Sequence, residues 1–359
     1  SGNSFEGISD ATSLSFTTHP LTQIGEDING EASDDYSGES VSLSADGSVV
    51  AIGALYNDGN GNDSGHVRIY QNNNGTWTKI GSDIDGEAAS DASGRSVSLS
   101  ADGSVVAIGA PFNDANGSNS GHVRIYQNVG GSWTKIGEDI DGEAASDYSG
   151  YSVALSDNGS VVAIGAYGND GNGSHSGHVR IYQNVGGSWT KIGEDIDGEA
   201  ASDTSGRSVS LSADGSVVAI GASGNDGNGN YSGHVRIYQN NNGTWTKIGS
   251  DIDGEAASDY SGESVSLSAD GSVVAVGAPG HGTNGEGLIR VYKNVNNNWT
   301  KIGSDIKGEY SWDQLGVNIS LSSDGLTLAT GSPWTRDSRG FAKVYKNINN
   351  IWTEIAEIE

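Results

Sequence analysis

The chain alternates short apolar runs with clusters of glycine, asparagine, aspartate and serine, which predicts many short strands joined by turns. Residues 40–44 alternate serine with valine and leucine, which predicts a strand with one apolar face. The pair Asp46-Gly47 follows, for which we expect a tight type I′ turn. Residues 49–54 are continuously apolar, as in a strand buried on both faces. Residues 66–71 and 77–80 predict two further strands.

This four-strand unit recurs with a period of about 56 residues. The valine of an S-G-x-S-V motif returns in five copies, and isoleucine replaces it in the sixth: Val41, Val97, Val153, Val209, Val265 and Ile319. Tandem four-stranded units are typical of propeller blades, each of which buries its faces against its neighbours. We therefore predict an all-β protein, a β-propeller of four-stranded antiparallel blades, with six blades favoured and seven as the alternative.

The repeats predict one domain. We assign residues 21–359 to a single β-propeller domain and residues 1–20 to an N-terminal segment. Residues 21–25 resemble the outermost strand of a blade, and we expect them to add to the last blade and close the ring. The chain starts with Ser1 and lacks an apolar signal core, so we expect a processed chain or a fragment.

The composition excludes several classes of partner and chemistry. A net charge of -28, from 46 acidic and 18 basic residues, excludes nucleic acid as a partner, because binding to it needs a basic surface. The chain has no cysteine, which excludes disulfides and thiol chemistry. No apolar run approaches 18 residues, so we expect no membrane insertion. The acidity suits divalent cations or a basic partner, and it equally suits a surface that only maintains solubility.

The motif S-G-x-S-V followed by G-A-P resembles the FG-GAP repeat family of integrin-α-like propellers. The first glycine of the family motif matches one residue in each copy, and G-A-P is complete at residues 109–111 and 277–279. The resemblance implies a propeller with an extracellular or cell-surface binding role. The chain departs from the family in two ways. Serine or leucine replaces the phenylalanine before the glycine, and the short Asp-Gly hairpin lacks the calcium loop that family members carry there.

A different set of loops offers calcium ligands. In each unit the loop after the second strand has alternate oxygen-bearing residues, and blade topology places it on the same face as the acidic crossovers between units. Calcium favours several oxygen ligands, whereas ordinary turn chemistry uses the same residue types. The candidate ligands are Asp58, Asn60, Asp114, Asn116, Asp170, Asn172, Asp226 and Asn228.

The sequence shows no familiar catalytic arrangement. His66, His122, His178 and His234 each open the third strand of a different unit, so we expect them to lie far apart and to be structural. The chain also lacks the G-x-S-x-G and H-E-x-x-H motifs. We therefore predict that it is not an enzyme.

The copies differ mainly at three loop positions on the acidic face, two of which flank the innermost strands at the channel mouth. Aromatic rings and arginines at such positions are typical of a surface that recognises a glycan or a protein loop, while random drift is the alternative. The candidate ligand-binding residues are Tyr56, Arg95, Phe112, Tyr151, Tyr167, Arg207 and Trp334.

These observations favour a secreted or cell-surface binding and adhesion module. We expect a monomer that recognises a glycan or an extracellular protein on its acidic, loop-rich face, with Ca²⁺ as the candidate cofactor. The alternative function is a ligand-free structural spacer within a larger surface protein.

Overall fold

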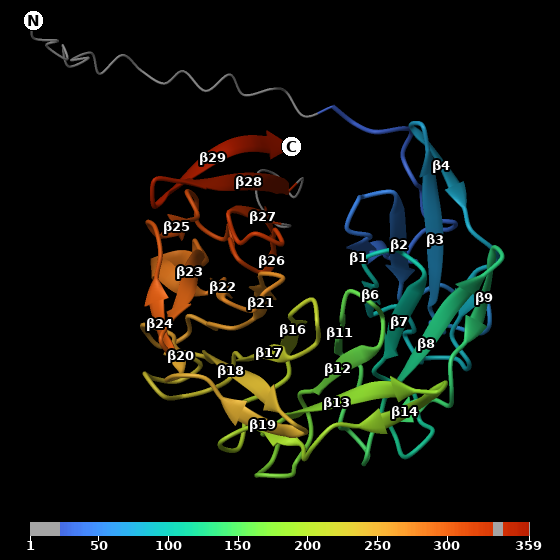
Figure 1. Cartoon of the computed structure of the whole chain (residues 1–359), viewed down its shortest axis with the longest axis horizontal. Helices are drawn as coiled ribbons and strands as arrows, with labels where there is room; N and C mark the ends of the chain where they lie inside the picture. Colours follow the sequence, from blue (N-terminus) through green and yellow to red (C-terminus); the bar gives the residue numbers. More distant parts are fainter. Residues whose placement is uncertain (1–21, 333–339, 359) are drawn as a thin grey trace, which may run out of the picture.

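The computed structural model describes residues 22–332 and 340–358, which form a six-bladed β-propeller (Figure 1). Each blade is an antiparallel sheet of four strands in sequence order, called A to D from the centre of the ring outward. In blades 1 to 5 the outermost strand, D, is divided into two short parts that both pair with strand C. This arrangement confirms the predicted all-β fold, the four-stranded blades and the count of six.

The first three blades have the same element order. Blade 1 contains β1 (Ser37–Leu43), β2 (Val49–Ala54), β3 (His66–Asn73), β4 (Thr76–Lys79) and β5 (Ile84–Asp85). Blade 2 contains β6 (Ser96–Leu99), β7 (Val105–Ala110), β8 (His122–Val129), β9 (Ser132–Lys135) and β10 (Ile140–Asp141). Blade 3 contains β11 (Ser152–Leu155), β12 (Val161–Ala166), β13 (His178–Val185), β14 (Ser188–Lys191) and β15 (Ile196–Asp197).

Blade 4 keeps this order, and blades 5 and 6 depart from it. Blade 4 contains β16 (Ser208–Leu211), β17 (Val217–Ala222), β18 (His234–Asn241), β19 (Thr244–Lys247) and β20 (Ile252–Asp253). Blade 5 contains β21 (Ser264–Leu267), β22 (Val273–Ala278), an irregular helical turn η1 (His281–Gly285), β23 (Leu288–Val295), β24 (Asn298–Lys301) and β25 (Ile306–Lys307). Blade 6 contains β26 (Asn318–Leu321), β27 (Thr327–Ser332), β28 (Phe341–Ile348) and β29 (Ile351–Ile358).

The B strands are buried on both faces, as their continuous apolar sequence predicts. The turn that precedes each of them differs from the prediction. In blade 1, Gly47 has a φ of 69° while Asp46 stays outside the positive-φ region, so the turn is not type I′. Asp46 accepts hydrogen bonds from the Ser48 backbone N–H and the Ser44 hydroxyl, at 2.9 and 2.8 Å. These bonds hold a longer loop, residues 44–48, in which Gly47 is left-handed, a role that glycine fills without strain.

Apolar clusters join successive blades at five junctions. Between blades 1 and 2, Val49 and Ile69 of one blade pack against Leu99 and Ile108 of the next. At the outer edge, the indole N–H of Trp133 donates to the Ile80 carbonyl of blade 1 at 3.0 Å, and equivalent tryptophans make the same bond at the other four junctions. Each blade therefore depends on its neighbours for burial.

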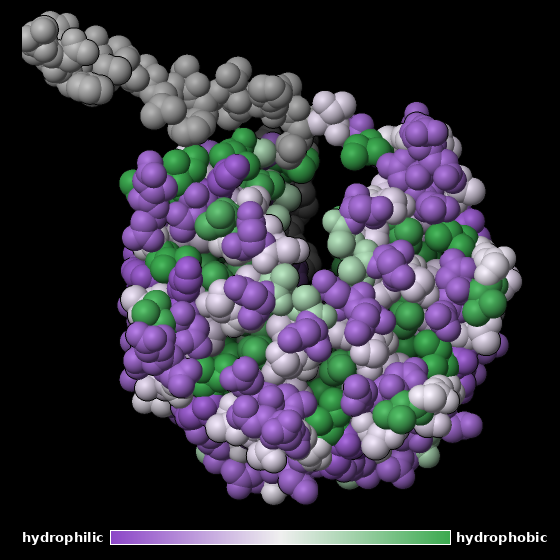
Figure 2. All heavy atoms as spheres, viewed as in Figure 1, coloured by the Kyte–Doolittle hydropathy of each residue, from purple (hydrophilic) through white to green (hydrophobic). Residues whose placement is uncertain are grey.

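The junction between blade 6 and blade 1 is open among the described residues. Val41 and Leu43 of β1 are 61% and 59% exposed, whereas their counterpart Leu99 in β6 is 7% exposed. Neighbouring A strands contact each other from blade 1 to blade 6, with no comparable contact between β26 and β1. The space-filling view shows a hollow where these two blades face each other (Figure 2).

The predicted closing strand is wrong over the residues that the structure describes. Residues 22–25 form no strand, and β29 pairs with β28 alone in the sheet of blade 6. The Ile24 carbonyl instead accepts the indole N–H of Trp77 in blade 1, at 2.9 Å. Trp77 of blade 1 thus bonds to the segment before it in the same way as Trp133 of blade 2 bonds to blade 1. Residues 1–21 lie outside the described part, and the domain division at residue 20 stays a prediction.

Candidate functional site

The residues at the x position of S-G-x-S contact one another around the channel mouth, although they are 56 residues apart in sequence. Arg95 lies 3.7 Å from the Glu39 carboxylate of blade 1 and donates to the Tyr151 hydroxyl of blade 3 at 2.7 Å. The guanidinium of Arg207 in blade 4 lies 4.8 Å from the Tyr151 ring centre and donates to Glu263 of blade 5 at 3.0 and 3.1 Å. We call these five residues the mouth belt.

An aromatic cluster extends the mouth belt outward over blades 2 and 3. The Tyr167 ring stacks on the Tyr148 ring with centres 5.1 Å apart, and meets the Tyr151 ring edge-on at 4.6 Å. Phe112 packs edge-on against Tyr148 at 5.8 Å. Burial among these groups raises the pKa of the Tyr167 phenol. Five of the seven predicted ligand-binding residues, namely Arg95, Phe112, Tyr151, Tyr167 and Arg207, are therefore in contact or share neighbours.

The other two predicted residues lie elsewhere. Tyr56 packs edge-on against Tyr36 of the same blade, with ring centres 5.2 Å apart, and takes no part in the aromatic cluster. Trp334 lies outside the described residues. Ligand binding by any of the seven residues stays a prediction.

A pocket of about 500 Å³ lies on the same face, where blade 5 meets blade 6. Its lining includes Glu263 of the mouth belt, Pro279 after β22, and the rings of Tyr260 and Trp312. Trp312 is 64% exposed and stands in the crossover before blade 6, at the place that Ser90 takes before blade 2. We missed Trp312 because we compared only three loop positions, although the change from serine to tryptophan was a visible signal.

The eight predicted calcium ligands already make hydrogen bonds, the aspartates within their own loops and the asparagines to the next crossover. In blade 1, the Asp58 carboxylate accepts the Asp63 backbone N–H at 2.8 Å, and the Asn60 amide donates to the Gly86 carbonyl at 2.8 Å. The remaining six repeat this pattern: Asp114, Asn116, Asp170, Asn172, Asp226 and Asn228. These bonds tie each loop to the next crossover, and calcium binding there stays a prediction.

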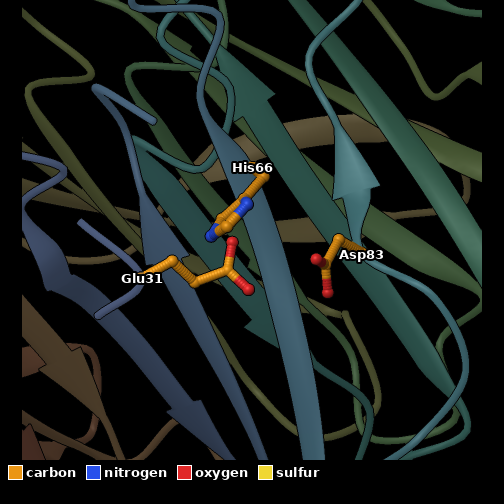
Figure 3. A group of neighbouring side chains, drawn as sticks. All are labelled: Glu31, His66 and Asp83. Atoms are coloured by element: carbon orange, nitrogen blue, oxygen red, sulfur yellow. The ribbon is translucent and has the colours of Figure 1, made fainter. Parts of the chain in front are cut away.

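The carboxylates that lie close to histidines are not those of the predicted calcium ligands. Four groups in the described residues, each with one Glu, one His and one Asp, hold ligand atoms within 4.8 Å of one another and could hold a metal ion. In the first, the side chains of Glu31 and Asp83 flank His66 (Figure 3). The other three are Glu87, His122 and Asp139, then Glu143, His178 and Asp195, then Glu199, His234 and Asp251. The histidines lie in separate blades, as expected, but each has acidic neighbours that we did not foresee.

The fold explains how each group forms. The histidine opens the C strand, the aspartate lies in the break between the two parts of the D strand, and the glutamate comes from the crossover of the preceding segment. Burial, with Arg124 and Arg180 acting in the same direction, lowers the pKa of His122 and of His178 to about 4. The rings are therefore neutral at neutral pH, which is the form of histidine that binds metals.

The comparisons with known proteins support the fold and the repeat family. Residues 83–126 and 140–182, in blades 2 and 3, match the model of the FG-GAP repeat. No curated protein matches the chain. The chain has no helix, within the described ranges, that is long and apolar enough to cross a bilayer.

Three similar solved structures are propeller-fold matches at low identity. The first is a candidate 6-phosphogluconolactonase from Bacteroides uniformis, with a TM-score of 0.62, 15% identity, and coverage of 89% of this chain and 85% of that one. The periplasmic gluconolactonase of Pseudomonas aeruginosa has a TM-score of 0.58, 14% identity and coverages of 89% and 85%. The hydrazine synthase of Kuenenia stuttgartiensis has a TM-score of 0.57, 11% identity and coverages of 90% and 79%.

These neighbours contradict the prediction that the chain is not an enzyme. Two of them carry lactonase names, so this fold is shared with proteins that are described as enzymes. The absence of familiar motifs was a weak argument, because one fold hosts many functions and each function depends on its site rather than on a short stretch of sequence. At 11–15% identity the likeness shows the fold alone.

The family assignment rests on sequence and structure together. Two blades match the FG-GAP model, the S-G-x-S-V motif recurs at the same place in blades 1, 4 and 5 and in altered form in blade 6, and all six blades share the order of their four main strands. The chain is a six-bladed β-propeller that carries FG-GAP repeats at residues 83–126 and 140–182.

Proposed function

We propose that the chain is an extracellular module that binds a neutral glycan on its loop-rich face. The binding site is the pocket between blades 5 and 6, and the mouth belt extends it across the channel mouth. The exposed Trp312 ring on the wall of this pocket carries the proposal, because a large apolar ring exposed to solvent in a concave site has no evident role in stabilising the fold.

The chemistry of the lining favours a sugar. Trp312 and Tyr260 offer flat rings against which the C–H faces of a sugar can pack, and Glu263 and Gln314 offer groups that bond hydroxyls. The Glu263 carboxylate already holds Arg207 at 3.0 Å, so the charges of the mouth belt are largely compensated. A net charge of -28 repels sulfated or uronic-acid polymers, which leaves neutral sugars as the ligand class.

The finer parts of the proposal follow from the resemblance and the loop composition. FG-GAP propellers of the integrin type act at cell surfaces, which supports an extracellular location and an adhesive role. Calcium, bound at the loops that contain Asp58 and its counterparts, would stiffen the same face. Thermal unfolding of the chain with calcium and then with a chelator tests this part, and equal melting temperatures in the two conditions would contradict it.

A glycan array followed by calorimetry tests the main proposal. We expect binding to a neutral glycan that Trp312→Ala weakens at least tenfold, because stacking on one ring contributes about 1.5 kcal/mol or more. Tyr56→Ala is the matched control: this ring lies on the same face, outside the pocket, and its loss should leave the affinity unchanged. Equal effects of the two changes would refute the pocket as the site.

The array also separates the alternatives. An array without any hit, together with capture of an extracellular matrix protein, would replace the glycan by a protein ligand on this face. An absence of both would favour the ligand-free spacer.

A further inference from the structure

We propose that the four Glu–His–Asp groups at blades 1 to 4 are binding sites for a divalent transition-metal ion of the zinc type. The inference is independent of the glycan proposal, because none of these residues lines the pocket between blades 5 and 6. It starts from the donor set: one imidazole nitrogen and two carboxylate oxygens, a mixture that suits zinc and its neighbours in the first transition row. Calcium prefers an all-oxygen shell.

Unpartnered histidine nitrogens are the second observation. The His122 side chain is fully buried, and neither of its ring nitrogens has a hydrogen-bond partner. The Nε2 atoms of His66, His178 and His234 are buried without a partner as well. A buried polar atom without a partner costs about 1–3 kcal/mol, and it recurs here in four blades. In His122 the Nδ1 atom, which faces Glu87, is among the unpartnered atoms, so a metal ion bound there would supply its partner.

The glutamates are oriented for such a role. Glu87 turns Oε1 toward Arg124, at 3.4 Å, and Oε2 toward the Nδ1 atom of His122, at 4.0 Å. Glu143 and Glu199 divide their oxygens in the same way. The arginine thus positions the carboxylate and leaves its second oxygen for a metal, as outer-sphere partners of metal ligands commonly do.

Closure of the site needs the ligand atoms, which lie within 4.8 Å of one another, to move closer together. Ligand atoms in a tetrahedral zinc site with bonds of about 2 Å lie roughly 3.3 Å apart, so the observed 4.0 Å between Glu87 and His122 must shorten slightly. The Glu87 side chain is 43% exposed and has the freedom to make this movement. Asp139 is held by Lys135 through Oδ1 at 2.7 Å and has a second oxygen to offer.

Blade 5 shows what happens where the histidine is missing. Leu288 stands at its position, and the equivalent carboxylates are Glu255 and Asp305. Arg290 bridges both of them, with distances of 2.6 Å to Glu255 and 2.9 and 3.0 Å to Asp305. In blades 1 to 4 the corresponding arginine instead donates to a backbone carbonyl, at 2.6–2.8 Å, and its Nε atom lacks a partner. In blade 5 the arginine therefore occupies both carboxylates, whereas in blades 1 to 4 it does not bridge them.

Zinc titration of the chelator-treated chain tests the proposal. We expect up to four ions per chain by calorimetry, and a Co²⁺ spectrum with the visible bands of nitrogen and oxygen coordination. Replacing His66, His122, His178 and His234 together by leucine should abolish this uptake. Leucine occupies this position natively in blade 5, so the variant is expected to fold, and its melting curve checks this.

Two further variants make the outcome decisive. Among the described residues, His175 and His281 belong to none of the groups, and their joint replacement by alanine should leave the uptake of zinc unchanged. Glu87→Gln keeps the packing and should weaken one site of the four at least tenfold. Absence of zinc uptake by the parent chain would overturn the proposal, and so would uptake that survives in the folded four-leucine variant.

Discussion

Blades 1 and 2 carry nearly the same sequence and differ in what lies beside them. Both A strands contain Ser-Val-Ser-Leu, yet Leu43 is 59% exposed in β1 while Leu99 is 7% exposed in β6. The cause is the neighbour: Leu99 packs on Val49 and Ile69 of blade 1, whereas the described part of blade 6 does not reach Leu43. An apolar pattern thus predicts a strand and its faces, but burial needs a partner surface.

The surface of blade 6 that faces the open junction is less apolar than the equivalent surface of blade 1. Thr327, Ala329 and Ala342 stand where blade 1 has Val49, Ala51 and Val67, and Ala329 is exposed. A smaller and more polar surface is typical of a terminal unit in a repeat array. Blade 6 is therefore adapted to an open side, and blade 1 is not.

The two blades should differ most in how much free energy of unfolding is lost when the A-strand leucine is replaced by alanine. Leu99→Ala should lower the free energy of unfolding by about 2–4 kcal/mol, because it leaves a cavity at the junction of blades 1 and 2. Leu43→Ala should lower it by less than about 0.5 kcal/mol, because the side chain is mostly exposed. Urea unfolding of both variants measures the difference, and equal costs would show that blade 1 is covered in solution.

Loss of a hydrogen bond should also lower the free energy of unfolding at a closed junction and not at the open one, but by less than loss of a leucine. The Ser266 hydroxyl of blade 5 accepts the Leu321 backbone N–H of blade 6 at 2.9 Å. Ser266→Ala should cost about 1 kcal/mol, because it leaves that N–H without its acceptor. Ser320 is the equivalent residue of blade 6, is exposed, and faces the open junction, so Ser320→Ala should have no measurable effect on unfolding. A cost at Ser320 would indicate a closed ring.

Hydrogen exchange should detect the open side in the unmodified chain. The amides of β1 are bonded to β2 in the same register as those of β6 to β7, so the local hydrogen bonding is alike. If burial at the junction contributes about 1 kcal/mol to local opening, β1 amides exchange roughly fivefold faster than their β6 counterparts. Equal protection of the two strands would contradict the comparison.

The turns should behave identically in both blades, because their hydrogen bonds are local. The Ser48 side chain and backbone lower the pKa of Asp46 from 3.8 to about 2, and Ser104 lowers that of Asp102. A depressed carboxyl pKa contributes stability that is present above about pH 4 and is lost as the pH falls toward 2. Asp46→Asn and Asp102→Asn should therefore cost equal, small amounts at pH 7 and nothing near pH 2.

Blade 3 supplies a natural precedent for this change. Asn158 replaces the aspartate there and keeps the bonds to Ser156 and Ser160. Unfolding curves at a series of pH values compare the two variants with the parent. A larger effect in blade 2 than in blade 1 would show that the neighbouring blade acts on the turn.

The sequence predicted much of the candidate ligand site and little of the candidate metal sites. Arg95, Tyr151 and Arg207 were identifiable because they vary among copies that are otherwise alike, and the ring brings them together. The group of Glu87, His122 and Asp139 escaped notice because its members lie 35 and 17 residues apart and hardly vary between blades. Blades 5 and 6, where Leu288 and Phe341 replace the histidine, break that uniformity.

The sequence by itself determined the strands and their faces, because these depend on residues within a single repeat, and it determined the count of six blades through the number of repeats. Alternation, turn residues and the repeat period express local backbone preferences and local burial. The tertiary structure alone decided which identical surfaces are buried, how the x residues form the mouth belt, and which glutamate meets which histidine. These features depend on contacts between residues about 35 to 56 positions apart, and one blade's sequence does not specify what its neighbour presents.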